Sequence, residues 1–267
     1  MRTRHVAAIM LRQYYLLRGS LSRLVPLFAW VGIDIILWGF IARYLNSFGA
    51  TGLNFVPLLL GAVLLWDFFT RVMQGVTIAF FEDVWARNFL NIFASPLSIG
   101  EYLAGLVITT IATSSLGLLV MLVLATTIFG LSFLSYGAMF IPFLLVLLFC
   151  GIALGIFCSA IVLRLGPSSE WFVWPIPALI TPFAGVFYPI ATLPRWMRYV
   201  SMLLPPSYVF EGMRSIISRG ATDYTGLLLG GALTLLYLFL AALFFRRVFR
   251  QAVKSGLIAR YSAESVG

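Results

Sequence analysis

Charged residues are scarce in this sequence of 267 residues: 18 are Lys or Arg and nine are Asp or Glu, so that only 10% of the chain is charged. Soluble globular domains carry about 25% charged residues. With 61% hydrophobic residues and a mean hydropathy of +1.02, the chain is too apolar for a soluble or a disordered protein. The two cysteines, Cys150 and Cys158, lie within one apolar run, which excludes a disulfide scaffold. The composition therefore predicts a protein that crosses the bilayer several times.

Residues for catalysis are equally rare. The sole histidine, His5, lies near the N-terminus, so that no histidine dyad or metal cluster is expected. The sole lysine, Lys254, follows Val253, which excludes the phosphate-binding loop Gly-x-x-x-x-Gly-Lys-Ser/Thr. We therefore predict no catalytic residue, no cofactor and no metal site, and any ATP must be bound by another subunit.

Six apolar runs are candidates for membrane spans, and they cover residues 24–45, 55–80, 101–128, 138–163, 171–190 and 225–245. Basic residues are concentrated before the first run and after the last one, where the sequence holds five on each side. This distribution is typical of anchors that face anionic lipid, and it argues against nucleic acid as a partner. Six spans place both termini on one side of the membrane, and the positive charge predicts that this side is the cytoplasm.

The predicted fold is an all-α polytopic membrane protein with three parts. Residues 1–23 form an N-terminal interfacial helix, in which apolar residues between 3 and 20 share one face; an extension of the first span is the alternative. Residues 24–245 form the six transmembrane helices, and residues 246–267 form a basic cytoplasmic tail.

The fifth run is not a simple span, because Pro175, Pro177, Pro182 and Pro189 interrupt it. An interior proline removes a backbone hydrogen bond, and a bilayer tolerates such a break only where protein or water satisfies the freed groups. The following residues, 190–219, are amphipathic and interrupted by further prolines. We expect them to form re-entrant or interfacial helices on the external side, before the last span.

The segment between the second and third runs predicts a short amphipathic cytoplasmic helix over residues 82–93. Its apolar positions follow helical spacing, and polar residues occupy the other face. Pro96 ends it, and Ser98 with Glu101 forms a capping box that starts the third span. Such a helix suits docking onto a soluble partner, although an ordinary loop helix has the same pattern. The residues that we assign to it are Glu82, Trp85, Arg87, Phe89, Leu90 and Ile92.

Three ionisable residues lie at membrane depth: Asp34 in the first span, and Asp67 and Arg71 in the second. Asp67 and Arg71 are four residues apart, so that they can pair along one helix face. Charged residues inside a bilayer face the bundle interior or water. Two interpretations remain open: these residues line a polar translocation path, or they form a structural ion pair.

Two segments resemble the permease subunits of ABC-2 type exporters. One is Arg87-Asn88-Phe89-Leu90 through Ala94-Ser95-Pro96-Leu97-Ser98. The other is Pro182-x-x-Gly185-Val186-Phe187-Tyr188-Pro189, followed by Leu193-Pro194-x-Trp196, Leu204-Pro205, Tyr208, Glu211 and Arg214. Their order, together with six runs and an N-terminal surface helix, extends the resemblance over essentially the whole chain.

The resemblance implies a homodimer, or a pseudo-dimer, of six-span halves in the bacterial cytoplasmic (inner) membrane, with two separate ATP-binding subunits that hold ATP and Mg²⁺. It implies that residues 82–93 are the coupling helix and that residues 1–23 are a gate helix. It also implies an external gate, to which we assign Gly185, Phe187, Tyr188, Pro189 and Trp196.

The cargo that the resemblance favours is a lipid-linked glycan or another amphipathic, lipid-like molecule. A drug or antibiotic efflux permease of the same family is the alternative. Two other classes are weaker candidates: an ion-driven secondary transporter, and an intramembrane enzyme that uses Asp34 with Asp67.

Overall fold

The computed structural model describes residues 2–48, 55–86, 88–166, 169–221 and 223–256. Their regular structure is helical, and the prediction of an all-α membrane protein is confirmed. Among the described residues, five segments are long and apolar enough to cross a membrane: Phe28–Ser47, Val56–Trp85, Ile99–Phe129, Tyr136–Leu165 and Tyr224–Lys254.

The helices follow one another with short connections. In chain order they are α1 (Thr3–Arg18), α2 (Leu21–Phe48), the π-helical turn η1 (Val56–Leu60), α3 (Gly61–Trp85), α4 (Phe89–Phe93), α5 (Ile99–Phe129), the 3₁₀ helix η2 (Phe133–Met139), α6 (Phe140–Leu165), α7 (Glu170–Val173), α8 (Ile176–Ala184), the 3₁₀ turn η4 (Ile190–Thr192), α9 (Arg195–Met202), α10 (Pro205–Arg219) and α11 (Tyr224–Lys254).

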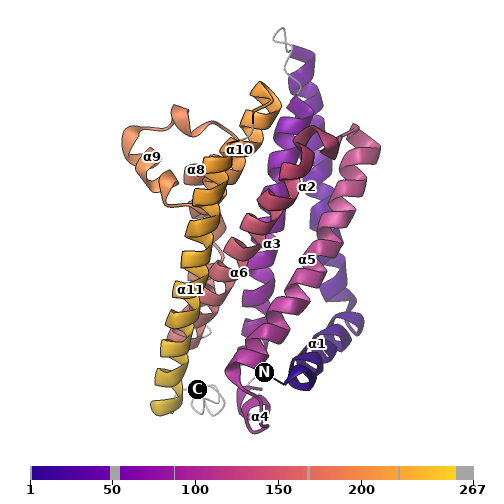
Figure 1. The fold of residues 1–267 in the computed structure, drawn as a ribbon. Coiled ribbons are helices and arrows are strands. Elements are labelled where there is room, and N and C mark those ends of the chain that lie inside the picture. The colour runs from indigo at the N-terminus through magenta and orange to yellow at the C-terminus, as the bar shows by residue number, and fades with distance from the viewer. Residues whose placement is uncertain (1, 49–54, 87, 167–168, 222, 257–267) are drawn as a thin grey trace.

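The long helices form an elongated bundle with two distinct ends (Figure 1). At the α1 end, α1 crosses the foot of α5 beside α4, and the C-terminal part of α11 lies at the same end. At the α9 end, α9 and α10 join the start of α11. α1 and the last turns of α11 thus lie at the same end of the bundle.

Helix α3 is the core of the bundle. Most of its residues are buried, whereas most residues of α2 and α11 are exposed or only partly buried. Helix α3 packs between α5 and α6, and α11 packs on α6. Glycines Gly151 and Gly155 of α6 allow the close approach to α3, since a Cβ on Gly155 would lie 2.9 Å from the carbonyl oxygen of Met73. The small-residue spacing of α6 therefore marks a helix contact, as is common in membranes.

Local signals set the ends of several helices. Ser98 and Glu101 form the predicted capping box at the start of α5, with Ser98 N 3.1 Å from the Glu101 carboxylate. Asp223 caps α11 through the backbone N–H of Gly226. α11 continues to Lys254, so that residues 246–254 of the predicted tail are helical; residues 257–267 lie outside the described part.

The fifth predicted span, 171–190, is not one helix, and the count of six spans is therefore not confirmed. The chain turns at Trp174 and Pro175 between α7 and α8, and α8 ends at Gly185 with a left-handed φ of +62°. The nine residues of α8 rise only about 14 Å, which is half of a bilayer core. Pro175 accounts for the break between α7 and α8, because it removes a backbone donor at the turn, whereas Pro177 and Pro182 lie within α8. The predicted external segment 190–219 does form short helices, α9 and α10.

The α3–α6 contact gives a first prediction. Gly155→Leu places side-chain atoms against Val76 and the backbone of α3, and overpacking of this kind costs about 1–3 kcal/mol. We expect a lower melting temperature in detergent. Gly32→Ala is the matched control, because a Cβ there meets nothing within 4 Å. Equal melting temperatures for Gly155→Leu and the wild type would contradict this packing.

Candidate functional site

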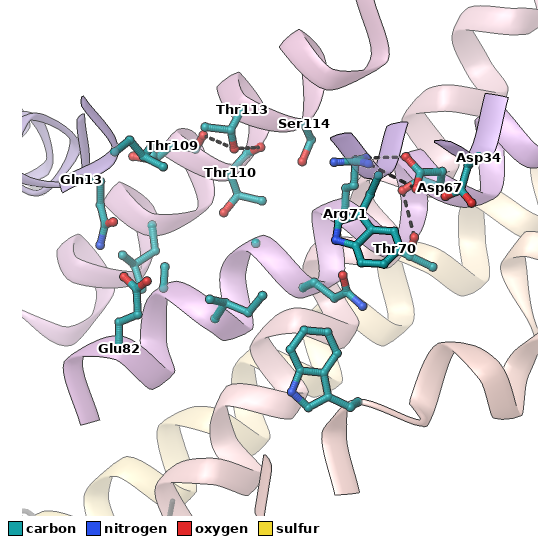
Figure 2. Close-up of a pocket in the computed structure, with 18 residues that line it drawn as sticks. Gln13, Asp34, Asp67, Thr70, Arg71, Glu82, Thr109, Thr110, Thr113 and Ser114 are labelled. Carbon is teal, nitrogen blue, oxygen red and sulfur yellow. Dashed lines mark hydrogen bonds and ion pairs between the residues drawn. The ribbon is translucent and has the colours of Figure 1, made fainter. Parts of the chain in front are cut away.

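A cleft of about 570 Å³ lies along α3, between α1, α2 and α5, with Trp174 also lining it. We call it the α3 cleft. Its volume is in the range of small-molecule sites. Polar side chains follow its whole length (Figure 2), and those labelled there are Gln13, Asp34, Asp67, Thr70, Arg71, Glu82, Thr109, Thr110, Thr113 and Ser114.

Asp67 and Arg71 form the ion pair that their spacing predicts. The Arg71 Nε donates to Asp67 Oδ2, and both side chains are about 15% exposed. Arg71 also lies along Gly117 of α5, where the absence of a side chain leaves room for the guanidinium stem. The pair is therefore held within the second span, on the wall of the α3 cleft.

The structure brings Asp34 to the same place. It lies on α2 beside Asp67 in Figure 2 and lines the α3 cleft with the ion pair. Within the described ranges, no hydrogen bond or ion pair joins Asp34 to another residue. The three ionisable residues at membrane depth thus gather in one cavity, although they come from two spans.

The hydroxyl groups of α5 were missed by the sequence analysis. Thr109 and Thr113 donate to carbonyl oxygens of their own helix, at 2.9 and 3.1 Å, and together with Thr110 and Ser114 they face the cleft. Their spacing was a usable signal, because hydroxyl residues at i and i+4 share one helix face. It was obscured by the strong apolar character of the run around them.

The predicted coupling helix 82–93 is not one helix. Glu82 and Trp85 belong to the end of α3, and α4 covers only Phe89–Phe93. Phe89 and Ile92 are buried, whereas Trp85 is 51% exposed, so that the apolar face of α4 points into the protein. Glu82 lines the α3 cleft. Arg87 and the side chain of Leu90 lie outside the described part.

Phe89 holds α4 against the bundle. Its ring contacts Phe80 of α3 and Tyr102 of α5, with centroids 5.2 and 6.1 Å apart. The ring of Phe89 thus connects α4 to both α3 and α5.

A buried carboxylate lies in the last turn of α3. Asp83 is 1% exposed and accepts hydrogen bonds from Arg12 of α1, at 3.0 Å, and from the hydroxyl of Tyr102, at 2.6 Å. A buried charge requires such partners. In the predicted helix 82–93, Asp83 is only one of several polar positions. Its partner Arg12 lies 71 residues earlier in the sequence, so that no local pattern indicates the ion pair.

A second carboxylate fixes the start of α1. Glu101 accepts from the backbone N–H of Arg2 at 2.7 Å and contacts His5 Nδ1 at 3.0 Å.

The pKa of Arg12 reflects its pairing with Asp83. Burial lowers the pKa of Arg12, but the hydrogen bond and the charge of Asp83 outweigh it and raise that pKa above its ordinary value. α1 is thus bound to the ends of α3 and α5 by charged contacts.

At the α9 end, Arg214 of α10 fastens the turn after α8. Its guanidinium donates to the carbonyl oxygens of Gly185, at 2.6 Å, and Val186, and it pairs with Glu211 at 2.9 Å. Glu211 in turn accepts the backbone N–H of Ile190. The turn that carries the predicted external gate is therefore held by two charged residues of α10.

The gate residues themselves have different surroundings. Phe187 stacks on Trp38 of α2, with centroids 4.7 Å apart, and the hydroxyl of Tyr188 donates to the carbonyl of Pro182. Pro189 and Trp196 are exposed. The structure thus connects Gly185, Phe187 and Tyr188 to the helices around them and leaves the other two at the surface.

Five membrane-length helices and a polar cleft among them define a multi-pass helical membrane protein. A family model described as "ABC-2 type transporter" matches residues 11–218, which is most of the chain. The chain therefore belongs to the ABC-2 type transporter family. It is a membrane transport subunit, and the family implies partnership with ATP-binding subunits. None of the curated proteins compared with the chain matches it.

The Asp83 contacts give a second prediction. Asp83→Asn leaves the guanidinium of Arg12 without its counter-ion, and breaking a buried pair of this kind costs about 2 kcal/mol or more. We expect faster amide exchange over residues 3–18, measured by mass spectrometry. Tyr102→Phe removes one hydrogen bond and should have a smaller effect of about 1 kcal/mol. Unchanged protection of α1 in Asp83→Asn would refute this role.

Proposed function

We propose that this chain is the permease subunit of an ABC-2 type exporter, which forms the translocation path as a homodimer and is driven by separate ATP-binding subunits. The observation that carries the proposal is the family match over residues 11–218, in a sequence that has no phosphate-binding loop of its own. The energy source must then act on the permease from outside.

The α1 end is the surface on which we place the ATP-binding subunits. It exposes Trp85, Asn91 and Pro96 on and beside α4. Because α4 follows α3 closely and packs on α5 through Phe89, a push on α4 moves the feet of both helices. α1 moves with them through Arg12 and Asp83. Coupling further requires that the partner contact α4 differently in its two nucleotide states.

The cytoplasmic orientation of this end is supported by charge. α11 carries Arg246, Arg247, Arg250 and Lys254 in its last turns, on the same side as α1. Basic residues favour the cytoplasmic side of a bilayer. We place the chain in the bacterial inner membrane with both termini inside and the α9 end outside, where Gly185, Phe187, Tyr188, Pro189 and Trp196 form the external gate.

The homodimer is supported by α2. Its outward face is a continuous apolar strip that includes Ile33, Leu37 and Phe40. A second copy that covers this strip also encloses the α3 cleft between two permease halves, so that Asp34, Asp67 and Arg71 line a shared path.

The cargo that we propose is amphipathic: a lipid-linked glycan or another lipid-like molecule. The polar α3 cleft beside exposed apolar helix faces suits a molecule with both characters. Export of a drug or antibiotic by the same route is the second candidate. An ion-driven transporter has less support, because Arg71 neutralises Asp67 and a proton relay is then reduced to the single carboxylate of Asp34.

Reconstitution tests the need for a motor. The tagged permease is purified from its native membrane together with its ATPase and placed in vesicles that contain an NBD-labelled lipid. We expect ATP-dependent movement of the label, which disappears when the ATPase is removed. Uptake driven by an imposed pH gradient, with the permease alone, would overturn the proposal in favour of an ion-driven transporter.

Trp85 and Phe89 give a third prediction, in which two aromatic residues of the coupling segment behave differently. Trp85→Ala removes an exposed contact and should lower transport severalfold while the permease stays folded. Phe89→Ala removes a buried ring and should lower the melting temperature, at a cost of about 3 kcal/mol. Tyr224→Ala, an exposed aromatic at the other end, is the control. Normal transport by Trp85→Ala would contradict the docking surface.

A further inference from the structure

The charges in the α3 cleft do not balance. Asp67 and Arg71 of α3 neutralise each other, whereas Asp34, on the α2 side of the cleft, has no hydrogen bond or ion pair within the described ranges. A carboxylate at membrane depth is costly unless a positive group or water compensates it. The cavity therefore offers a negative position to whatever enters it, next to a pair that is already neutral.

Gln13 is a second, independent sign of a ligand. Its side chain is on α1, is 5% exposed and lines the cleft, and its Nε2 forms no hydrogen bond within the described part of the chain. In Figure 2 the side chain extends from α1 toward the end of α3 that carries Glu82. Buried amide groups are nearly always paired. The unpaired amide donor of Gln13 is explained if an oxygen atom of a ligand in the cleft accepts a hydrogen bond from it.

The wall between these two positions is rich in hydrogen-bond acceptors. Three hydroxyl groups donate their hydrogen bonds to carbonyl oxygens of their own helices: those of Thr109 and Thr113 on α5 and that of Thr70 on α3. Their lone pairs remain for the cavity, because a hydroxyl oxygen accepts as well as donates. This wall favours a ligand that donates hydrogen bonds.

Apolar surface accompanies the polar wall. Trp30 and Trp174 line the cleft and are 61% and 47% exposed, and Ile78 lies between its ends. Indole faces attract cations as well as apolar groups.

We propose that the α3 cleft binds an amphipathic molecule through a protonated amine, with Asp34 as the counter-ion. The ammonium group donates to Asp34, further donors along the ligand donate to the hydroxyl oxygens of α5, an oxygen of the ligand accepts from Gln13, and the apolar body lies against the two tryptophans. The inference deepens the proposed function and rests on it, since it names the chemical feature that the exporter recognises. An anionic headgroup is disfavoured at the same position.

The test is a binding assay on the full chain in phosphatidylcholine nanodiscs, without ATP or ATPase. Three dansyl probes share an eight-carbon chain and end in an amine, an alcohol or a carboxylate. Energy transfer from tryptophan reports binding. We expect the amine probe to bind at least about tenfold more tightly than the other two. Equal binding of the three, or preference for the carboxylate, would overturn the proposal.

Two variants locate the site. Asp34→Asn should weaken the amine probe about tenfold and leave the alcohol probe unchanged, and it should fold normally because no partner is lost. Equal weakening of all probes would overturn the counter-ion role. Gln13→Leu should weaken the amine and alcohol probes alike, without loss of thermal stability; no change in affinity would overturn its part in the site. Asp223→Asn is the control, because Asn also caps helices.

The amine can belong to an amino sugar or to a drug-like base, and a further comparison separates them. An alkyl glucosaminide is measured against the alkyl glucoside and the simple alkylamine. Tighter binding of the glucosaminide than of both supports an amine-bearing glycolipid, whereas equal binding of glucosaminide and alkylamine supports recognition of the amine alone. Because no ATPase is present, failure of amine selectivity refutes this inference only, and failure of ATP-driven transport refutes only the proposed function.

Discussion

The buried carboxylate of Asp83 is the constraint on which the α1 end depends. A charge that is removed from water must be matched by partners of fixed geometry, and here α1 supplies Arg12 while α5 supplies Tyr102. One side chain thus joins the last turn of α3 to α1 and to α5. The α3 cleft begins beside these contacts, at Glu82 and Gln13.

Sequence periodicity was sufficient for features that depend on neighbouring residues. The apolar runs, the Ser98–Glu101 capping box, the Asp67–Arg71 pair and the break at the prolines all follow from local spacing, and the structure contains each of them. The structure of the coupling segment 82–93 was harder to predict from the sequence. Phe89 and Ile92 were recognised as one apolar face, but only the packing against Phe80 and Tyr102 shows that this face is buried.

The α3 cleft was predicted only in part, for a physical reason. Asp34, Asp67 and Arg71 were conspicuous because charge is rare at membrane depth. Gln13 was not, since a glutamine in an amphipathic surface helix is unremarkable until the crossing of α1 over α5 buries it. That crossing depends on Gly105, where a Cβ would lie 2.6 Å from Ile9. Contacts between helices of distant sequence position decide such sites, and no local pattern encodes them.

The broken segment α7–α8 has a consequence for solvation. Pro175, Pro177 and Pro182 carry no N–H, so that the carbonyl oxygens of residues 171, 173 and 178 lack the helical donor four positions later. In hydrocarbon these oxygens need water or a polar neighbour. Water or a polar headgroup can supply these missing donors, so that this flank would favour a polar group over the purely hydrocarbon surface of the neighbouring helices.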